Sequence, residues 1–145
     1  MRAGERVFVD TNVLLYSLDT ADPAKRSASR RWMTALWESG AGRLSWQVLN
    51  EFYANAVRKF GADAFRARAS VEAFATWQPV EQSLLLVQRA WHWADAAQTP
   101  YWDGLIVAAA ERAECQWLLS EDFPVGQKFG TVVVINPFQV QPEDL

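Results

Sequence analysis

The sequence predicts a single α/β domain over residues 1–145, a three-layer α/β/α sandwich with a central and mainly parallel sheet. Three observations lead to this prediction. The chain has 145 residues, the usual length of one globular domain. Short, wholly apolar runs indicate strands that are buried on both faces. Longer segments with capping residues and helical periodicity separate these runs, and such alternation is typical of a parallel sheet covered by helices.

The first two expected elements have clear boundaries. Val7–Val9 is a β-branched and aromatic run, which we expect to form a buried strand that ends at Asp10. Asp22 is a typical helix N-cap, and Pro23 after it suits the first helical position. The helix that begins there is expected to stop near Gly40, because glycine favours the left-handed conformation that ends helices.

The rest of the chain follows the same alternation. Ser45 is a second N-cap, and Pro79 and Pro100 mark breaks between helices. The segment from Gly126 to Gly130 is expected to be a flexible loop. The remaining expected elements are helices over residues 45–61, 63–77, 83–97 and 103–114, followed by strands over residues 116–119 and 131–135.

Composition excludes several classes of protein. Half of the residues are hydrophobic and 21% are charged, as in ordinary folded domains. The single cysteine, Cys115, excludes an internal disulfide framework, and its apolar surroundings favour a buried thiol. The first residues do not form a signal peptide, and no run approaches the ~20 apolar residues of a membrane helix. We therefore expect a cytoplasmic protein without a membrane partner.

Charge is distributed unevenly along the chain. Residues 1–70 hold 11 Lys and Arg against 7 Asp and Glu, whereas residues 71–145 hold 3 against 10. The charges of the first half either scatter over solvated surfaces or form one basic face for nucleic acid, and the sequence leaves both interpretations open. The residues of such a face would be Lys25, Arg26, Arg30, Arg31, Arg58, Lys59, Arg66 and Arg68.

Four acidic residues interrupt apolar segments. Asp10 and Asp122 follow expected strands, where sites gather in α/β folds. Asp103 opens an apolar helix, and Glu51 lies beside the apolar face of another. Taken singly, each residue has a simpler explanation as a turn, loop, cap or surface residue. Taken together they predict converging carboxylates, whose mutual repulsion a divalent cation would relieve.

The available ligands indicate which metal would bind. With one His and one Cys, the chain cannot assemble a zinc site of the usual nitrogen and sulfur type. An oxygen-only site suits Mg²⁺ or Mn²⁺, and the chemistry that such a site favours is phosphodiester hydrolysis. Asn12 and Ser120 are suited to hold the carboxylates by hydrogen bonds. Trp46 and Trp102 lie close to the acids in sequence, and are expected either to pack in the core or to stack on unpaired bases.

At these residues the chain resembles PIN-domain ribonucleases of the VapC toxin type. The resemblance extends over nearly the whole length and rests on an ordered set of short motifs. These are Val9–Tyr16, Asn50–Phe52, Tyr101–Ala110, Leu118–Phe123, Gly126–Gln127 and Ile135–Phe138.

The resemblance implies a metal-dependent endoribonuclease with a PIN-like fold and an RNA substrate. It implies that Asp10, Glu51, Asp103 and Asp122 are the catalytic and metal-binding acids. Proteins of this type are usually toxins of type II toxin–antitoxin systems, so a cognate antitoxin and a homodimer are also implied. If the basic residues of the first half form one face, Arg30 and Lys59 are the candidates for RNA binding.

Three other functions compete with the toxin. A housekeeping PIN nuclease in RNA maturation would have the same site without toxicity, and a non-catalytic PIN-fold binding module would have no reason to keep all four acids. A phosphatase of the haloacid-dehalogenase type also begins with a strand ending in Asp, but it needs a second Asp where this chain has Asn12. No GxGxxG, Walker A or GxSxG motif is present, which disfavours nucleotide-binding and serine-hydrolase functions.

Overall fold

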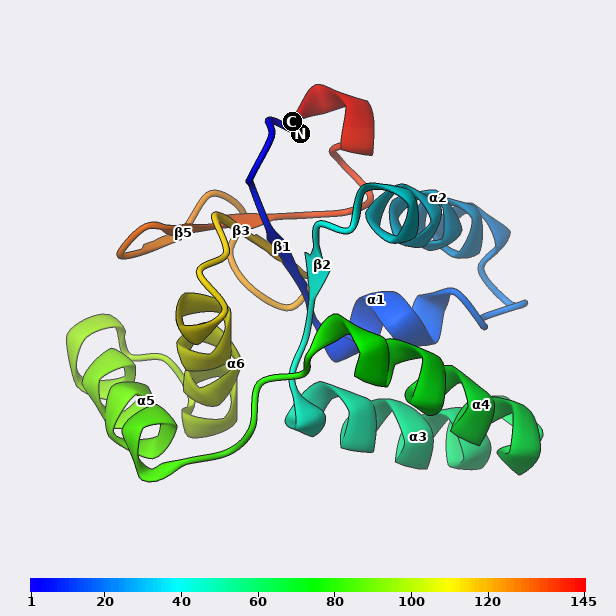
Figure 1. The fold of residues 1–145 in the computed structure, drawn as a ribbon, viewed down its shortest axis with the longest axis horizontal. Coiled ribbons are helices and arrows are strands. Elements are labelled where there is room, and N and C mark those ends of the chain that lie inside the picture. The colour runs from blue at the N-terminus through cyan, green and yellow to red at the C-terminus, as the bar shows by residue number, and fades with distance from the viewer.

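A computed structural model describes all residues 1–145, and a five-stranded sheet lies at its centre (Figure 1). The strand order is β2-β1-β3-β5-β4. The first four strands in this order are parallel, and β4 is antiparallel to β5. The strands are β1 (Val7–Val9), β2 (Gly42–Arg43), β3 (Trp117–Leu119), β4 (Lys128–Phe129) and β5 (Val132–Ile135).

Six helices surround the sheet, and the predicted three-layer α/β/α class is confirmed. Helix α2 packs on β2, whereas α6 packs on β3 and β5 and is covered in turn by α5. Figure 1 shows α1 to α4 on one side of β1 and the α5–α6 pair on the other. The helices are α1 (Thr11–Tyr16), α2 (Pro23–Ser39), α3 (Trp46–Phe60), α4 (Ala64–Phe74), α5 (Leu84–Ala97) and α6 (Tyr101–Arg112). None of them combines the length and apolar character needed to cross a bilayer.

The capping residues define the helix ends as the sequence predicts. The Asp22 side chain accepts a hydrogen bond from the Lys25 amide at the start of α2, and Ser45 caps α3 in the same way. Gly40 ends α2 with a left-handed φ of 69°, a conformation that glycine adopts without steric cost. The helix expected over 63–77 is α4 followed by a 3₁₀ turn, Ala75–Trp77.

Two local expectations were wrong, and one helix was not expected at all. The segment between Gly126 and Gly130 contains β4, which pairs with β5 as the outer arm of a hairpin and buries Phe129 completely. The last helix begins at Tyr101, with Pro100 as its N-cap, so Asp103 is its third residue and does not open it. Helix α1 was not expected, because a six-residue helix is too short for its periodicity to be recognised.

Strand β2 depends on a glycine. A methyl group at Gly42 would overlap the indole ring of Trp77. Overpacking of this kind costs about 1–3 kcal/mol, so we expect Gly42→Ala to lower the free energy of unfolding by that amount. Urea denaturation measures it. The loss should shrink in a Trp77→Phe background, where the smaller ring leaves room, and an equal loss in both backgrounds would refute the proposed overlap.

Candidate active site

The candidate site lies where the connections of the sheet diverge. The chain leaves β1 toward β2 on one side, and leaves β3 toward β5 on the other. The carboxyl ends of β1 and β3 therefore flank a topological switch point, the usual position of a site in an open α/β sheet. Asp10 directly follows β1 and Ser120 directly follows β3. The order of the strands thus brings together two residues that are 110 positions apart.

Asp10 is the most buried acid of the site. Only 7% of its surface is exposed. It is the N-cap of α1, and one carboxylate oxygen accepts a hydrogen bond from the Thr11 amide at 2.8 Å. The other oxygen accepts from the Ser120 hydroxyl at 2.7 Å. Burial raises the pKa of Asp10 to about 6, and the charges of Asp122 and Glu51 add to the rise.

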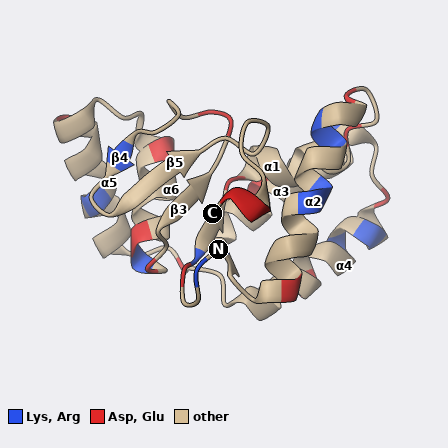
Figure 2. Ribbon diagram, turned by 90° about the horizontal axis from the view of Figure 1, so that it is seen from above, with Lys and Arg blue, Asp and Glu red and all other residues tan.

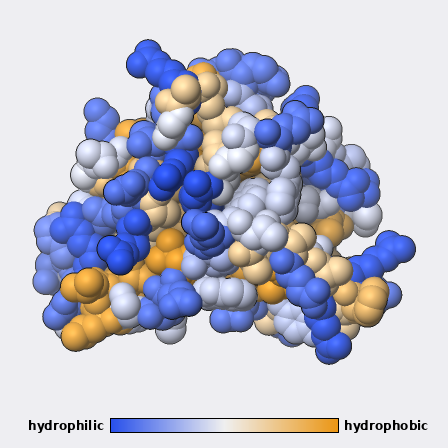
Figure 3. Space-filling view, in the orientation of Figure 1, coloured by the Kyte–Doolittle hydropathy of each residue, from blue (hydrophilic) through white to orange (hydrophobic).

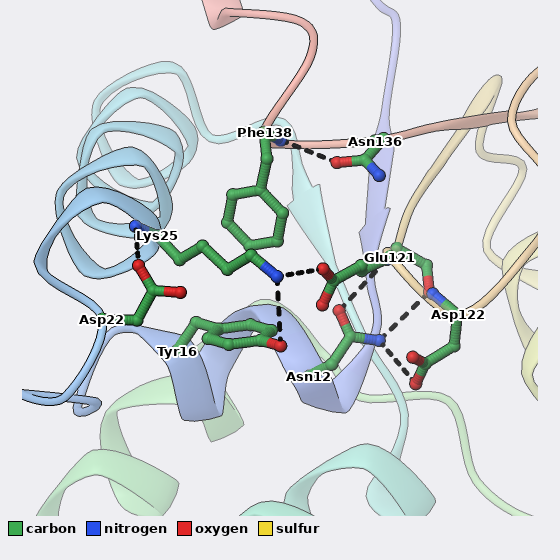
Figure 4. Close-up of polar contacts among 9 residues, drawn as sticks. Asn12, Tyr16, Asp22, Lys25, Glu121, Asp122, Asn136 and Phe138 are labelled. Atoms are coloured by element: carbon green, nitrogen blue, oxygen red, sulfur yellow. Dashed lines mark hydrogen bonds and ion pairs between the residues drawn. The ribbon is translucent and has the colours of Figure 1, made fainter.

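Asn12 connects both sides of the switch point (Figure 4). Its amide nitrogen lies 3.2 Å from an Asp10 oxygen and 3.1 Å from an Asp122 oxygen, and it donates to both. Its amide oxygen accepts a hydrogen bond from the Glu121 backbone. The Ser120 hydroxyl accepts from the Asp122 amide at 3.0 Å. Asn12 of α1 therefore orients the carboxylates of Asp10 and Asp122. Ser120 at the end of β3 holds the Asp10 carboxylate and the Asp122 backbone.

Glu51 reaches the site from α3. One of its oxygens accepts from the Thr11 hydroxyl at 2.8 Å, and the other accepts from the Gln47 amide at 3.2 Å. Gln47 also donates to the Trp102 carbonyl at 3.4 Å, which links α3 to the first turn of α6. Sequence reasoning missed Thr11 and Gln47. The signal for Gln47 was its place four residues before Glu51, on the same helix face.

Asp103 enters from the first turn of α6 and is half-buried. Burial raises its pKa, and the charges of Asp122 and Glu51 raise it further. Its position depends on Gly104, because a Cβ there would stand 3.0 Å from the Ala90 carbonyl oxygen of α5. The absence of a side chain lets α6 pack closely on α5 and sets where Asp103 lies.

The four acids influence one another electrostatically without any partner of opposite charge. Asp10 and Asp103 are each destabilised by the charges of Asp122 and Glu51. The three ion pairs of the protein involve other acids. No three of its His, Cys, Asp and Glu side chains stand close enough together to form a ready-made metal site. The set nevertheless fits a hard divalent cation, since its donors are all carboxylate oxygens and a cation would relieve their repulsion.

Glu121 and Asp122 are adjacent in sequence but face different partners. Glu121 forms an ion pair with Lys25, whose ammonium lies 4.8 Å from the centre of the Tyr16 ring and 5.0 Å from that of Phe138 (Figure 4). Burial alone would raise the pKa of Glu121, but hydrogen bonds from Lys25 and Tyr16 outweigh it and lower that pKa. Asp122 faces Asn12 instead. The charge of Glu121 is thus neutralised outside the group of four acids.

None of the remaining residues considered from sequence forms a hydrogen bond to the four acids. Cys115 is buried as predicted, and burial raises the pKa of its thiol to about 12, so it remains protonated. Arg30 is on α2, where its side chain donates to the Ser17 carbonyl. Lys59 is exposed in the last turn of α3. Trp46 packs against the core, whereas Trp102 is 66% exposed.

The fold and the site define an α/β protein with a buried, hydrogen-bonded Asp10 at the switch point of its sheet and further acids near it. Residues 7–123 match the profile of the PIN domain, and the chain belongs to the PIN domain family. The resemblance seen in the sequence is therefore confirmed at the level of the family. No curated protein matches the chain in sequence.

Solved structures of low sequence identity share the fold. A toxin–antitoxin complex from Klebsiella pneumoniae aligns with a TM-score of 0.60 and 15% identity, covering 88% of this chain and 95% of that one. VapC20 from Mycobacterium tuberculosis, described as a sarcin–ricin loop cleaving toxin, gives 0.58 and 19%, covering 77% and 86%. VapBC2 from Rickettsia felis, bound to a promoter DNA fragment, gives 0.60 and 11%, covering 90% and 97%.

Proposed function

We propose that this PIN domain is a Mg²⁺- or Mn²⁺-dependent endoribonuclease and the toxin of a toxin–antitoxin pair. The observation that carries the proposal is that Asp122 and Glu51 lie near enough to Asp10 and Asp103 to raise the pKa of both, while none of the four acids has an ion-pair partner. A buried carboxylate without a partner of opposite charge destabilises a fold, so the presence of Asp10 together with three neighbouring acids favours a role in cation binding.

In this proposal one set of residues binds the cation and a second set orients the first. Asp10 and Asp103, with Asp122 and Glu51, would hold the cation. Asn12 and Ser120 keep Asp10 and Asp122 oriented, and Thr11 and Gln47 do the same for Glu51. When bound, the cation would activate a water molecule and stabilise negative charge on the leaving oxygen of the phosphodiester.

The structural neighbours support the toxin role. One is a toxin–antitoxin complex, and another is described as a toxin that cleaves the sarcin–ricin loop. By analogy we propose a cognate antitoxin as a protein partner, RNA as the substrate and the cytoplasm as the location. Growth arrest on induction, relieved by co-expression of a neighbouring small protein, would support the toxin over a housekeeping nuclease of RNA maturation.

We also propose that the protein forms a homodimer. Exposed apolar side chains support this proposal, because large apolar patches on soluble proteins mark interaction surfaces. Leu84 and Leu85 are 67% and 69% exposed at the start of α5, and Trp91 of the same helix is 54% exposed. Figure 3 shows apolar atoms at the surface at the end of the molecule where Figure 1 places α5. Light scattering of the purified protein tests the assembly.

Cleavage of a panel of structured RNAs tests the activity. The purified protein should cut at least one RNA in Mg²⁺ or Mn²⁺ and none in excess chelator, and cutting should return when the metal is restored. Cutting that persists in chelator would contradict metal dependence. Absence of cutting, together with absence of metal binding by calorimetry, would leave a non-catalytic binding module as the better description.

Replacing Asp122 should impair cleavage far more than replacing its neighbour Glu121. Asp122→Asn removes a charge from the group of four acids, so we expect a loss of about a hundredfold or more. Glu121→Gln removes a charge that Lys25 already neutralises. It can affect cleavage only by shifting the loop that also carries Asp122, so we expect a loss below about tenfold. Single-turnover cleavage measures both. The reverse order would make Glu121 the acid of the site.

Arg30 and Lys59 are proposed to contact RNA phosphates. Both side chains are exposed. Figure 2 shows Lys and Arg on α2 and α4, at the end of the molecule away from α5. Each change to Ala should weaken RNA binding at low salt and lower the slope of log affinity against log salt by about one. Lys128→Ala, on β4, is the matched control, and slopes equal to that of the wild type would exclude these contacts.

A further inference from the structure

Trp102 stands out among the tryptophans near the acids. Of the two in the sequence neighbourhood of an acid, Trp46 packs against the core, while Trp102 leaves 66% of its surface exposed. Burial of a large aromatic ring stabilises the folded protein. The ring of Trp46 gains this stabilisation, and the exposed ring of Trp102 does not. The fold does not need Trp102 as core material, and its ring is free to receive a ligand.

The position of Trp102 is tied to the acids through backbone and side chains. It directly precedes Asp103 in the first turn of α6. The Gln47 amide donates to the Trp102 carbonyl at 3.4 Å and to the Glu51 carboxylate at 3.2 Å. The same amide therefore fixes an acid of the site and the backbone that carries the exposed ring.

A second aromatic ring lies against the first. Tyr101 is 36% exposed, and its ring centre lies 5.3 Å from that of Trp102 with an angle of 68° between the planes. In this edge-to-face arrangement the rings are not stacked face on face, so each ring meets the other over only a small part of its surface. Tyr101 lies at the side of the indole, and Trp102 keeps most of its surface open to solvent.

We propose that Trp102, with Tyr101 at its side, is a stacking platform for one unpaired nucleobase of the RNA substrate. This inference rests on the proposed nuclease function. When a phosphodiester of the RNA is bound at the four acids, the bases next to it lie at the edge of the site, beside Trp102. Every base has an aromatic face, so a ring at this place binds unpaired nucleotides and does not accommodate a continuous duplex. The platform selects single-stranded or extruded positions next to the scissile bond.

Binding of a labelled single-stranded RNA octamer tests the platform. Affinity is measured in chelator, where the RNA stays intact, for the wild type, Trp102→Ala and Trp102→Phe. We expect Trp102→Ala to weaken binding by about tenfold, the usual contribution of one stacked base, and Trp102→Phe to retain most of the affinity. Phe65→Ala removes another exposed ring, 78% accessible on α4, and should bind as the wild type does.

A set of octamers with one abasic nucleotide at successive positions identifies the stacked base. At one position, the abasic nucleotide should weaken binding to the wild type by the same factor as Trp102→Ala does. The same octamer should bind Trp102→Ala no more weakly than the intact octamer does. Equal affinity of Trp102→Ala and the wild type would overturn the platform, as would a loss independent of abasic position. A change in oligomeric state of Trp102→Ala, seen by light scattering, would instead assign the ring to a protein interface. Failure of the wild type to bind any RNA would refute the nuclease proposal itself.

Discussion

Asp10→Asn and Asp103→Asn should each abolish RNA cleavage in a protein that remains folded. Loss of a hydrogen-bonding partner around a metal ligand reduces metal affinity or activity by about 10–100-fold, so loss of a ligand itself should exceed about a hundredfold. Asparagine keeps the size of the side chain and one acceptor oxygen, so the Thr11 amide still has a partner. The change removes the negative charge and leaves the shape almost unaltered.

Single-turnover cleavage and calorimetric metal titration measure this effect. Asp95→Asn is the matched control, because it removes one exposed carboxylate from α5, outside the group of four acids. It should cleave and bind metal as the wild type does. Near-normal activity in either site variant, with circular dichroism showing a native fold, would place the metal and the chemistry elsewhere.

The sequence predicts the elements whose signals are local. Asp22 and Gly40 mark the limits of α2, and the apolar run Val7–Val9 marks β1, because capping residues and buried strands have strong preferences. Strands β2 and β4 have only two residues each and show no alternation. They exist because neighbouring strands offer hydrogen-bonding partners, which a single segment does not reveal.

The residues of the candidate site also divide into those with a local sequence signal and those that depend on long-range contacts. Asp10 and Asp122 were singled out because each follows an apolar strand. Their shared partner Asn12 was expected as a hydrogen-bonding residue, and the structure adds that it contacts Asp10, Ser120 and Asp122. Asp122 was preferred over Glu121 from the sequence, but the reason that Glu121 faces another partner could not be predicted. It depends on Lys25, 96 residues away, which only the folded chain brings to Glu121.

The burial of Asp10 predicts an unusual dependence of stability on pH in metal-free protein. Its pKa rises from an ordinary value of 3.8 to about 6 in the folded state, so the folded chain holds this proton more tightly than the unfolded chain. Stability from this group is therefore complete below about pH 4 and falls as the pH rises toward 6. The shift corresponds to about 3 kcal/mol at neutral pH.

Asp10→Asn removes this titration. In chelator, the free energy of unfolding of the variant minus that of the wild type should grow between pH 4 and pH 7 by up to about 3 kcal/mol. Urea denaturation at several pH values measures the difference. Asp95→Asn should show no comparable change, and parallel curves for Asp10→Asn and the wild type would refute a buried, destabilising charge at Asp10.

Metal should remove most of the difference in stability between Asp10→Asn and the wild type at neutral pH. A cation that binds only the folded wild type stabilises it by mass action, by about 2.7 kcal/mol at a hundred times the dissociation constant. Millimolar Mg²⁺ or Mn²⁺ should therefore recover most of the stability that ionised Asp10 costs, and should leave Asp10→Asn nearly unchanged. The same carboxylate would then weaken the empty fold and strengthen the loaded one, as expected if these acids are retained for a cation and contribute nothing to the stability of the apo protein.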